Sequence, residues 1–367
     1  MPKNSDLLFK TFESEKLQLS NRIVMAPMTR SFSPGGIPGE DVAAYYRKRA
    51  ESDVGLIVTE GTTVDYDVST NDANVPEFVN DEAITGWKRV VEEVHAVGGK
   101  IAPQLWHMGM GRGKDSGPTP ERPSIGPSGF VAAGKKVTDP MTIEQIEDVI
   151  AKFAAAAEKA KAIGFDAIEV HGAHGYLVDQ FFWEGTNQRD DEYGGSLLKR
   201  TRFAVEIVKA IRAKVGEDFP IIFRFSQWKL QDYEAKLVNT KDELGQFLAP
   251  LVEAGVDIFH ASTRRYWLPE FDGSPLNLAG WTQKLSGKPT ITVGCVGLDD
   301  EFIKAFTGGG AGTTNIDPLL EQVERGDYEL VGVGRALLSD PDWVIKMKEG
   351  RFSDMTPFTK EVLGSLD

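Results

Sequence analysis

The chain has 367 residues, of which 41% are hydrophobic and 26% charged, and its formal net charge is −14 at pH 7. This charge argues against a nucleic-acid or anionic-membrane partner. The sequence has no run of eighteen apolar residues, as a membrane span would require, and no charged-then-apolar N-terminal segment of the kind that marks an exported protein. The single cysteine, Cys295, excludes an internal disulfide and any multi-cysteine metal or iron–sulfur site. We therefore expect a cytoplasmic protein.

Apolar strand-like runs alternate with helical patterns about eight times along the chain. A short hairpin is expected over Leu8–Leu19, where it could close the bottom of a barrel. Strands are expected at Arg22–Met28, Val54–Thr59, Ile101–Leu105, Phe165–Val170, Pro220–Phe225, Val256–His260, Pro289–Val293 and Leu330–Val333. Helices are expected at Asp41–Ala50, Asp81–Val97, Thr142–Ile163, Ser196–Val215, Lys241–Glu253, Asp299–Phe306 and Ala336–Lys348.

This alternation predicts one (β/α)8 barrel domain over residues 1–367. Strands separated by helices at this spacing run parallel with right-handed crossovers, and eight such units close a barrel. An open doubly wound sheet is disfavoured because no Gly-x-Gly-x-x-Gly follows the first strand. The length needs no second domain, since single α/β barrels often exceed the usual domain size.

Two long irregular stretches interrupt the pattern after the third and sixth strands. The first, from His107 to Pro140, is dense in glycine and proline, and the second runs from Ala261 to about Leu278. Loops of this length inside a compact domain are usually functional. We expect both to form lids, the first of them over one barrel mouth.

Three residues with mobile or polarising protons follow the fourth strand: His171, His174 and Tyr176. Gly172 and Gly175 let the backbone turn there and leave room for these side chains to face a ligand. Polar groups at the carboxyl ends of strands carry the chemistry of such barrels. A His-x-x-His pair can also bind zinc, but no third ligand of a suitable type follows at a usable spacing, so we expect no metal.

Glycine clusters follow the seventh and eighth strands. They are Gly294 and Gly297 in the first case, and Gly332 and Gly334 in the second, where Arg335 comes next. In barrels of this kind these two loops often form a phosphate site, to which an arginine adds a bidentate charge. Two ordinary strand-to-helix turns are the alternative. The coincidence of both clusters with an arginine favours the phosphate site.

Together these residues resemble one family. The run from His171 to Phe181, His-Gly-Ala-His-Gly-Tyr-Leu-x-Asp-Gln-Phe, and then Asn187-x-Arg-x-Asp-x-Tyr-Gly-Gly-Ser look like the signature of the Old Yellow Enzyme family of FMN-dependent ene-reductases. The resemblance extends to Asn21–Thr29, Thr59–Gly61, Gln104–Trp106, Arg224 and Gly332–Arg335, and so spans nearly the whole chain. One departure is Phe182-Trp183-Glu184, where Leu-Ser-Pro is commoner.

The resemblance implies tightly but non-covalently bound FMN, which NADPH or NADH reduces and which passes hydride to an α,β-unsaturated carbonyl, a nitroalkene or a nitrate ester. Thr29 would bind near the flavin C4 carbonyl, Gln104 would bind the pyrimidine edge, and Arg224 would lie near N1. From the residues alone, Thr29 could instead cap a helix, Gln104 could be a buried amide satisfied by backbone, and Arg224 could form a structural ion pair. The remaining cofactor residues would be Pro27, Met28, Gly61, Gly294, Gly297, Gly332, Gly334 and Arg335.

The resemblance also assigns the substrate side of the site. His171 and His174 would hold the carbonyl or nitro oxygen, and Tyr176 would protonate the α-carbon. Tyr66, Trp106 and Trp267 would be aromatic walls, although each could equally be core or lid packing. His95 is expected at the surface, and the roles of His107 and His260 stay open.

Two alternative functions are less consistent with the sequence. A flavin-free lyase or aldolase acting on a sugar phosphate would need a Schiff-base lysine at a strand end, and none of the eight expected strand ends shows one. A flavin-binding scaffold or sensor conflicts with the intact set of His171, His174 and Tyr176. The sequence leaves open the alkene, the choice between monomer and homodimer, and the nicotinamide, for which Arg264-Arg265 could favour a 2′-phosphate.

Overall fold

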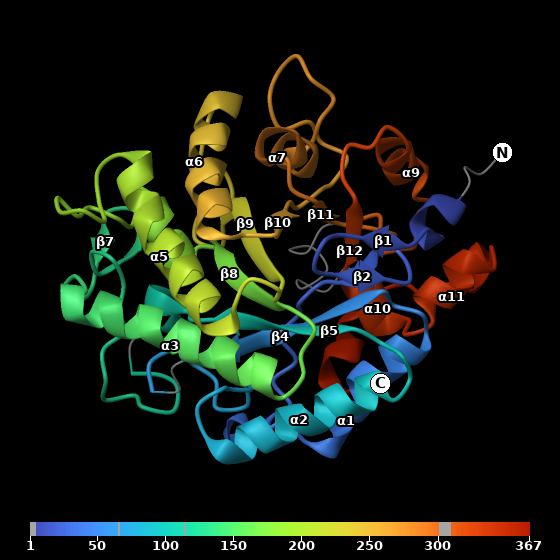
Figure 1. Cartoon of the computed structure of the whole chain (residues 1–367), viewed down its shortest axis with the longest axis horizontal. Helices are drawn as coiled ribbons and strands as arrows, with labels where there is room; N and C mark the ends of the chain where they lie inside the picture. The colour runs from blue at the N-terminus through green and yellow to red at the C-terminus, as the bar shows by residue number, and fades with distance from the viewer. Residues whose placement is uncertain (1–4, 65–66, 114, 301–309) are drawn as a thin grey trace.

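A computed structural model describes residues 5–64, 67–113, 115–300 and 310–367. Eight parallel strands close a barrel in the order β10-β11-β12-β3-β4-β5-β8-β9 (Figure 1), which confirms the predicted (β/α)8 architecture. The barrel strands are β3 (Ile23–Met25), β4 (Leu56–Thr63), β5 (Ile101–Trp106), β8 (Ile168–His174), β9 (Ile221–Lys229), β10 (Ile258–Ser262), β11 (Thr290–Val293) and β12 (Leu330–Val333).

Helices surround the strands (Figure 1). They are α1 (Glu40–Glu51), α2 (Asp81–His95), α3 (Ile143–Ala162), α4 (Leu177–Phe182), α5 (Leu197–Val215), α6 (Lys241–Ala254), α7 (Leu278–Ser286), α9 (Asp317–Glu324), α10 (Arg335–Ser339) and α11 (Trp343–Lys348). The Thr142 side chain accepts from Gln145 N–H, and the Gln145 side chain accepts from Thr142 N–H, so α3 begins with a capping box. No helix of the described residues is long and apolar enough to cross a membrane.

The helix predictions need two corrections. The short helices α4, α7 and α9 were not predicted. The predicted last helix, Ala336–Lys348, is two helices, because α10 ends at Ser339 before Pro341 and α11 begins at Trp343. Most of the predicted helix Asp299–Phe306 lies outside the described residues.

The barrel interior is apolar at its amino end. Phe12, Leu17 and Leu19 of the N-terminal hairpin join one buried cluster with alternate residues of the barrel strands. The hairpin strands β1 (Phe12–Glu13) and β2 (Gln18–Leu19) pair antiparallel. The barrel residues of this cluster are Val24, Leu56, Val58, Ala102, Ile222, Ile258, Ile291 and Leu330, with Ala167 just before β8. Because side chains alternate across a strand, the positions two residues after Ala102, Ala167, Ile222 and Ile258 share their inward side, and these are the polar residues Gln104, Glu169, Arg224 and His260.

The sequence predicts that the stretch after β5 is irregular, but it contains regular elements. It contains the 3-10 turn η3 (Gly109–Arg112) and a small antiparallel pair, β6 (Phe130–Ala132) with β7 (Lys135–Lys136). Arg112 is buried and donates hydrogen bonds to the carbonyl oxygens of Thr70 at 3.2 Å and Arg122 at 2.7 Å. The second stretch ends in α7. That either stretch acts as a lid stays a prediction.

Candidate active site

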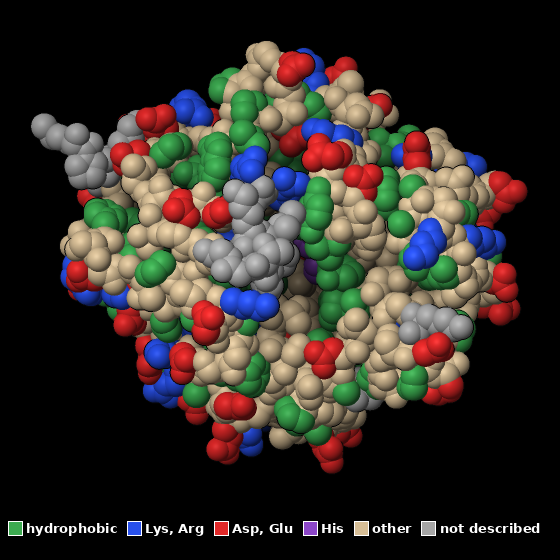
Figure 2. Space-filling view, turned by 180° about the vertical axis from the view of Figure 1, so that it is seen from behind, with side chains coloured by type: hydrophobic (Ala, Val, Ile, Leu, Met, Phe, Trp, Pro, Cys, Tyr) green, Lys and Arg blue, Asp and Glu red, His purple; other side chains and the backbone are tan. Residues whose placement is uncertain are grey.

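A cavity of about 490 Å³ lies at the carboxyl ends of the barrel strands, a size in the usual range of ligand sites. Figure 2 shows a hollow in this face with histidine at its base. Residues from many strand ends converge on the cavity, among them fourteen of the predicted site residues: Pro27, Met28, Thr29, Gly61, Gln104, Trp106, His171, His174, Tyr176, Arg224, Gly294, Gly332, Gly334 and Arg335.

Two predicted site residues are placed differently, and a third is not described. Gly297 does not line the cavity; a Cβ there would meet the Trp343 ring at 3.1–3.3 Å, so this glycine allows α11 to approach the loop after β11. Trp267 is 37% exposed and packs edge-on against Tyr266 outside the cavity. Tyr66 lies outside the described residues.

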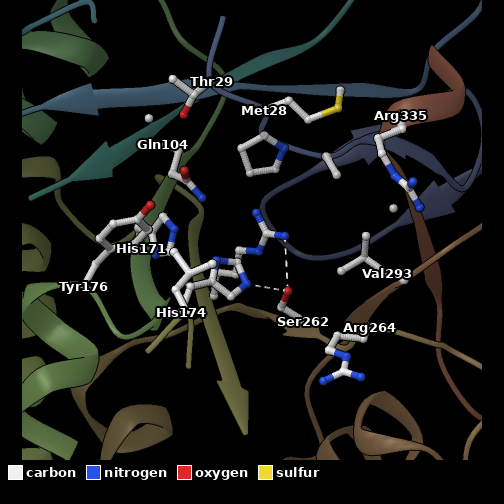
Figure 3. A pocket seen from close by; sticks show the side chains of 18 of the residues that line it. Met28, Thr29, Gln104, His171, His174, Tyr176, Ser262, Arg264, Val293 and Arg335 are labelled. Atoms are coloured by element: carbon white, nitrogen blue, oxygen red, sulfur yellow. Dashed lines mark hydrogen bonds between the residues drawn. The ribbon is translucent and has the colours of Figure 1, made fainter. Parts of the chain in front are cut away.

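The two histidines and the tyrosine form one cluster (Figure 3). The ring centroids of His171 and His174 are 5.1 Å apart, and those of His171 and Tyr176 are also 5.1 Å apart, with both pairs nearly perpendicular. Trp106 packs edge-on against Tyr176 at 5.2 Å. Burial lowers the pKa of both histidines and raises the pKa of Tyr176 to about 12. The imidazoles are therefore neutral donors near neutral pH, and the tyrosine keeps its proton.

His174 is held by neighbours that the sequence did not identify. Its Nε2 lies 2.8 Å from the Ser262 hydroxyl, and its ring stacks on Trp228 at 4.5 Å. Trp228 in turn stacks on Tyr233 at 5.8 Å, and both aromatic residues line the cavity. The His174 backbone has φ = +65°, and its N–H donates to Ser226 Oγ of the neighbouring strand β9 at 2.9 Å. The histidine thus lies in a fixed orientation.

A buried ion pair supports the turn that carries these groups. Lys229 Nζ lies 2.5 Å from Asp179 Oδ1, and both side chains are fully buried. Asp179 Oδ2 accepts a hydrogen bond from the Gly175 N–H at 2.7 Å. The expectation that no lysine stands at a strand end was wrong, because β9 extends to Lys229. This lysine does not line the cavity, so it is not placed to form a Schiff base with a ligand there.

Two arginines that line the cavity have unused donors, and the backbone at Gly334 is open. Within the described part of the chain, Arg335 Nη1 and Arg224 Nε are buried without a hydrogen-bond partner. A Cβ at Gly334 would meet only Met28 Sδ, at 3.5 Å, so the backbone there opens into the cavity. Arg335 Nη2 donates to the Asp300 carbonyl oxygen at 2.6 Å, which fixes the guanidinium. These features fit a phosphate next to Arg335 and an electron-rich ring next to Arg224.

Gln104 and Arg224 make polar contacts within the barrel. Gln104 Nε2 donates to the Glu169 side chain at 2.8 Å. The partner of this buried amide is therefore a side chain and not the backbone. Arg224 Nη2 donates to Ser262 Oγ at 3.2 Å (Figure 3). Thr29 lies at the cavity wall and does not cap a helix, since α1 begins at Glu40.

The remaining histidines have structural contacts. His95 is exposed, as expected, and lies 2.9 Å from Asp166. His107 is buried, and its Nδ1 accepts from the Gly109 N–H at 3.0 Å. His260 is fully buried and contacts Glu169. Among the described residues, no group of three or more His, Cys, Asp or Glu side chains is placed to hold a metal ion.

Comparison with known proteins identifies the family to which the chain belongs. The family described as the NADH:flavin oxidoreductase / NADH oxidase family matches residues 7–354. The chain belongs to this family. Proteins similar to the chain include several named as reductases, and the resemblance to Old Yellow Enzymes is confirmed. The expected FMN and nicotinamide hydride donor agree with the family and with the site described above.

Several family members align with nearly the whole chain. It is 37% identical to an NADH oxidase of Thermoanaerobacter brockii over 95% of the chain but only 52% of that protein, so it spans about half the length of this relative. It is 31% identical to 12-oxophytodienoate reductase 7 of Oryza sativa subsp. japonica, over 93% of the chain and 87% of the reductase. Morphinone reductase in complex with tetrahydroNAD superposes with a TM-score of 0.80 at 26% identity, covering 98% and 96% of the two chains.

Proposed function

We propose that this flavoprotein is an ene-reductase formed by a single domain over residues 1–367. NADPH or NADH is the electron source, and the substrate is an alkene activated by a carbonyl or nitro group, or a nitrate ester. The observation that carries the proposal is the convergence of His171, His174 and Tyr176 on a cavity that Arg224 and Arg335 also line. Arg224 lies next to His171 in strand register, whereas Arg335 lies on the side away from His171 and Tyr176 (Figure 3), which leaves room for a flavin between them.

FMN, when bound, supplies the hydride that is accepted from nicotinamide and delivered to the β-carbon of the alkene. His171 and His174 each offer one N–H to the substrate oxygen, so they stabilise the negative charge that develops there. Tyr176 gives its hydroxyl proton to the α-carbon and regains a proton from solvent. Its raised pKa keeps it protonated, as this role requires. Trp106, Trp228 and Tyr233 line the space for the alkene.

Arg224, Gln104, Thr29 and the backbone at Gly61 would hold the isoalloxazine ring, and Gly294, Gly332, Gly334 and Arg335 would hold the phosphate. The T-shaped contact of Tyr176 with His171 supports a proton donor next to the pair that would bind the substrate oxygen. The similarity to 12-oxophytodienoate reductases and morphinone reductase supports an unsaturated carbonyl as the substrate class.

The test uses the purified protein. We expect a yellow protein that releases FMN and not FAD, is reduced anaerobically by NADPH or NADH, and is reoxidised by 2-cyclohexenone with formation of the saturated ketone. A colourless protein that does not take up FMN would contradict the whole proposal. Reoxidation by O₂ but by no alkene, nitroalkene or nitrate ester would contradict the ene-reductase assignment alone.

A further inference from the structure

Glu169 is a buried carboxylate that the proposed reaction does not use. It lies on β8 two residues before His171, and its side chain is fully buried. Its Oε1 accepts from Gln104 Nε2 at 2.8 Å, and its Oε2 lies 2.6 Å from His260 Nδ1. Gln104 and Glu169 are register partners on adjacent strands, whereas His260 reaches Glu169 from β10, across the interior. The three side chains form a continuous buried chain below the cavity floor.

The chemistry of these groups fixes the direction of each hydrogen bond. A carboxylate can only accept, so Glu169 receives an N–H from both partners. One N–H of the Gln104 amide is therefore directed at Glu169, which leaves the carbonyl oxygen and the second N–H for the cavity that Gln104 lines. Without Glu169, either end of this amide could face the cavity.

The same reasoning fixes the protonation of His260. Its Nε2 is buried and, among the described residues, makes no hydrogen bond. An imidazolium would bury an unpartnered N–H there, while a neutral ring with its proton on Nδ1 leaves only a bare acceptor. Burial accordingly lowers the pKa of His260. Burial alone would raise the pKa of Glu169, but His260 and Arg224 hold it below its usual value. The chain thus carries one negative charge, which Arg224 balances.

We propose that Glu169 and His260 are positioning residues, which present the Gln104 carbonyl oxygen to the imide N–H of the flavin and keep a fixed negative charge next to the cofactor site. The flavin pyrimidine ring has one such N–H between two carbonyl groups, so it requires an acceptor flanked by donors. The negative charge opposes the charge that the flavin gains on reduction and so offsets part of the effect of Arg224. This inference rests on FMN binding in the cavity and not on the alkene as substrate.

The decisive variant is Glu169→Gln. His260 would still donate to the new carbonyl oxygen, so the new amide nitrogen would face Gln104 and turn its carbonyl oxygen away from the cavity. We expect the Kd for FMN, measured by fluorescence quenching with FMN-stripped protein, to rise about tenfold or more, as for the loss of a hydrogen bond to a buried group. At a fixed potential, the ratio of reduced to oxidised flavin should rise about tenfold, which is ~30 mV for a two-electron couple.

Matched variants separate positioning from other effects. Glu158→Gln removes the same charge from an exposed residue of α3 and should leave both quantities unchanged. In a Gln104→Ala background, Glu169→Gln should no longer change the Kd for FMN, while its effect on the potential should remain. His260→Asn keeps an N–H donor near the Nδ1 position and should bind FMN like the wild type, whereas His260→Phe should bind it about tenfold more weakly. The His260 pair decides the question if Glu169→Gln does not fold.

Three results would overturn the inference. One is a Glu169→Gln protein whose Kd for FMN and potential both stay within twofold of the wild-type values. Another is an equal loss of FMN affinity in the Gln104→Ala background, since the effect would then not pass through Gln104. The third is equal binding by His260→Asn and His260→Phe. Failure of the wild-type protein to bind FMN would instead contradict the proposed function, so the two failures are distinguishable.

Discussion

His174 Nε2 and Ser262 Oγ are joined by a hydrogen bond of 2.8 Å, and Arg224 Nη2 donates to the same hydroxyl oxygen at 3.2 Å. Because Arg224 can only donate, we infer that the Ser262 hydroxyl proton goes to His174, whose own proton then lies on Nδ1. His171 differs, because its Nδ1 accepts from the Ala173 N–H at 3.3 Å and its proton therefore lies on Nε2. On this assignment, the proposed substrate oxygen would receive N–H groups from different ring nitrogens of the two histidines.

Ser262→Ala should therefore weaken substrate activation without removing a substrate ligand. His174 would lose the partner that selects its tautomer, and a fraction of the protein would lack the Nδ1–H donor. We expect the oxidative half-reaction with 2-cyclohexenone to slow about fivefold, in line with one hydrogen bond. Stopped-flow absorbance measures this, and ¹⁵N NMR of the imidazoles reports the tautomer directly. A wild-type His174 that carries its proton on Nε2 would contradict the assignment.

His174→Asn and His174→Ala separate a hydrogen-bond donor from a proton donor. Asparagine offers an amide N–H of similar reach, so this variant should keep most of the activity. Alanine removes the donor and should cost on the order of 10²-fold in the oxidative half-reaction. Because burial lowers the pKa of His174, the wild-type and asparagine proteins should share the same pH profile. An asparagine variant as slow as the alanine one would refute the donor role.

Tyr176→Phe should affect only the step that needs a proton on carbon. Flavin reduction by NADPH or NADH should stay within about twofold of the wild type, while reoxidation by an enone should slow by ~10²–10⁴-fold. Reoxidation by a quinone, which needs no protonation at carbon, serves as the control. The pKa of about 12 predicts a wild-type rate without a tyrosine limb between pH 6 and 9. Equal loss with enone and quinone would show that Tyr176 is structural.

The sequence predicted the cavity-lining residues at the carboxyl ends of the strands, because an apolar run that ends in polar residues indicates both a strand and the residues that line the site. Arg224 was recognised because it is a charge inside an apolar strand. Glu169, between Ile168 and Val170, meets the same criterion and could have been found in the same way. Its partners could not, since the contact with His260 spans 91 residues and depends on barrel closure. Ser262, a small residue at a strand end, carries no distinguishing sequence signal.

The elements that sequence patterns missed are short. α4 and α7 have six and nine residues, too few for a helical period to stand out from the neighbouring loops. Their formation depends on tertiary contacts, as the full burial of Asp179 in α4 against Lys229 illustrates. Gly297 shows a related limit, because a glycine in a turn does not reveal whether it opens toward a ligand or toward a helix.

Lys229→Met should strongly destabilise the protein. It leaves the carboxylate of Asp179 buried without its cation, and breaking a buried ion pair in this way costs about 3–5 kcal/mol. The double variant Lys229→Met/Asp179→Asn should recover much of this loss, since no unpaired charge remains. Urea unfolding of the three proteins measures the free energies. A double variant no more stable than Lys229→Met would show that the Lys229 amine has a role beyond neutralising Asp179.

Glu60→Gln should change the pH dependence of stability. Glu60 Oε2 accepts from the N–H groups of Arg30 at 2.8 Å and Ser31 at 3.0 Å, and so holds the loop that follows Thr29. Burial raises the pKa of Glu60 from 4.5 to about 7. Between these values the folded protein holds a proton that the unfolded chain has released. The stabilisation is therefore fully present below pH 4.5 and is lost as the pH rises through 7.

Glutamine keeps a carbonyl oxygen for the two N–H groups but does not titrate. The free energy of unfolding of Glu60→Gln relative to wild type should therefore rise from pH 5 to pH 8, approaching a total of ~3 kcal/mol for a shift of this size. Urea unfolding at pH 5, 6, 7 and 8 measures the difference, and the surface variant Glu158→Gln should show none of this trend. A difference that stays constant across these pH values would mean that Glu60 is already ionised in the folded protein at pH 5, with its two backbone donors outweighing the effect of burial.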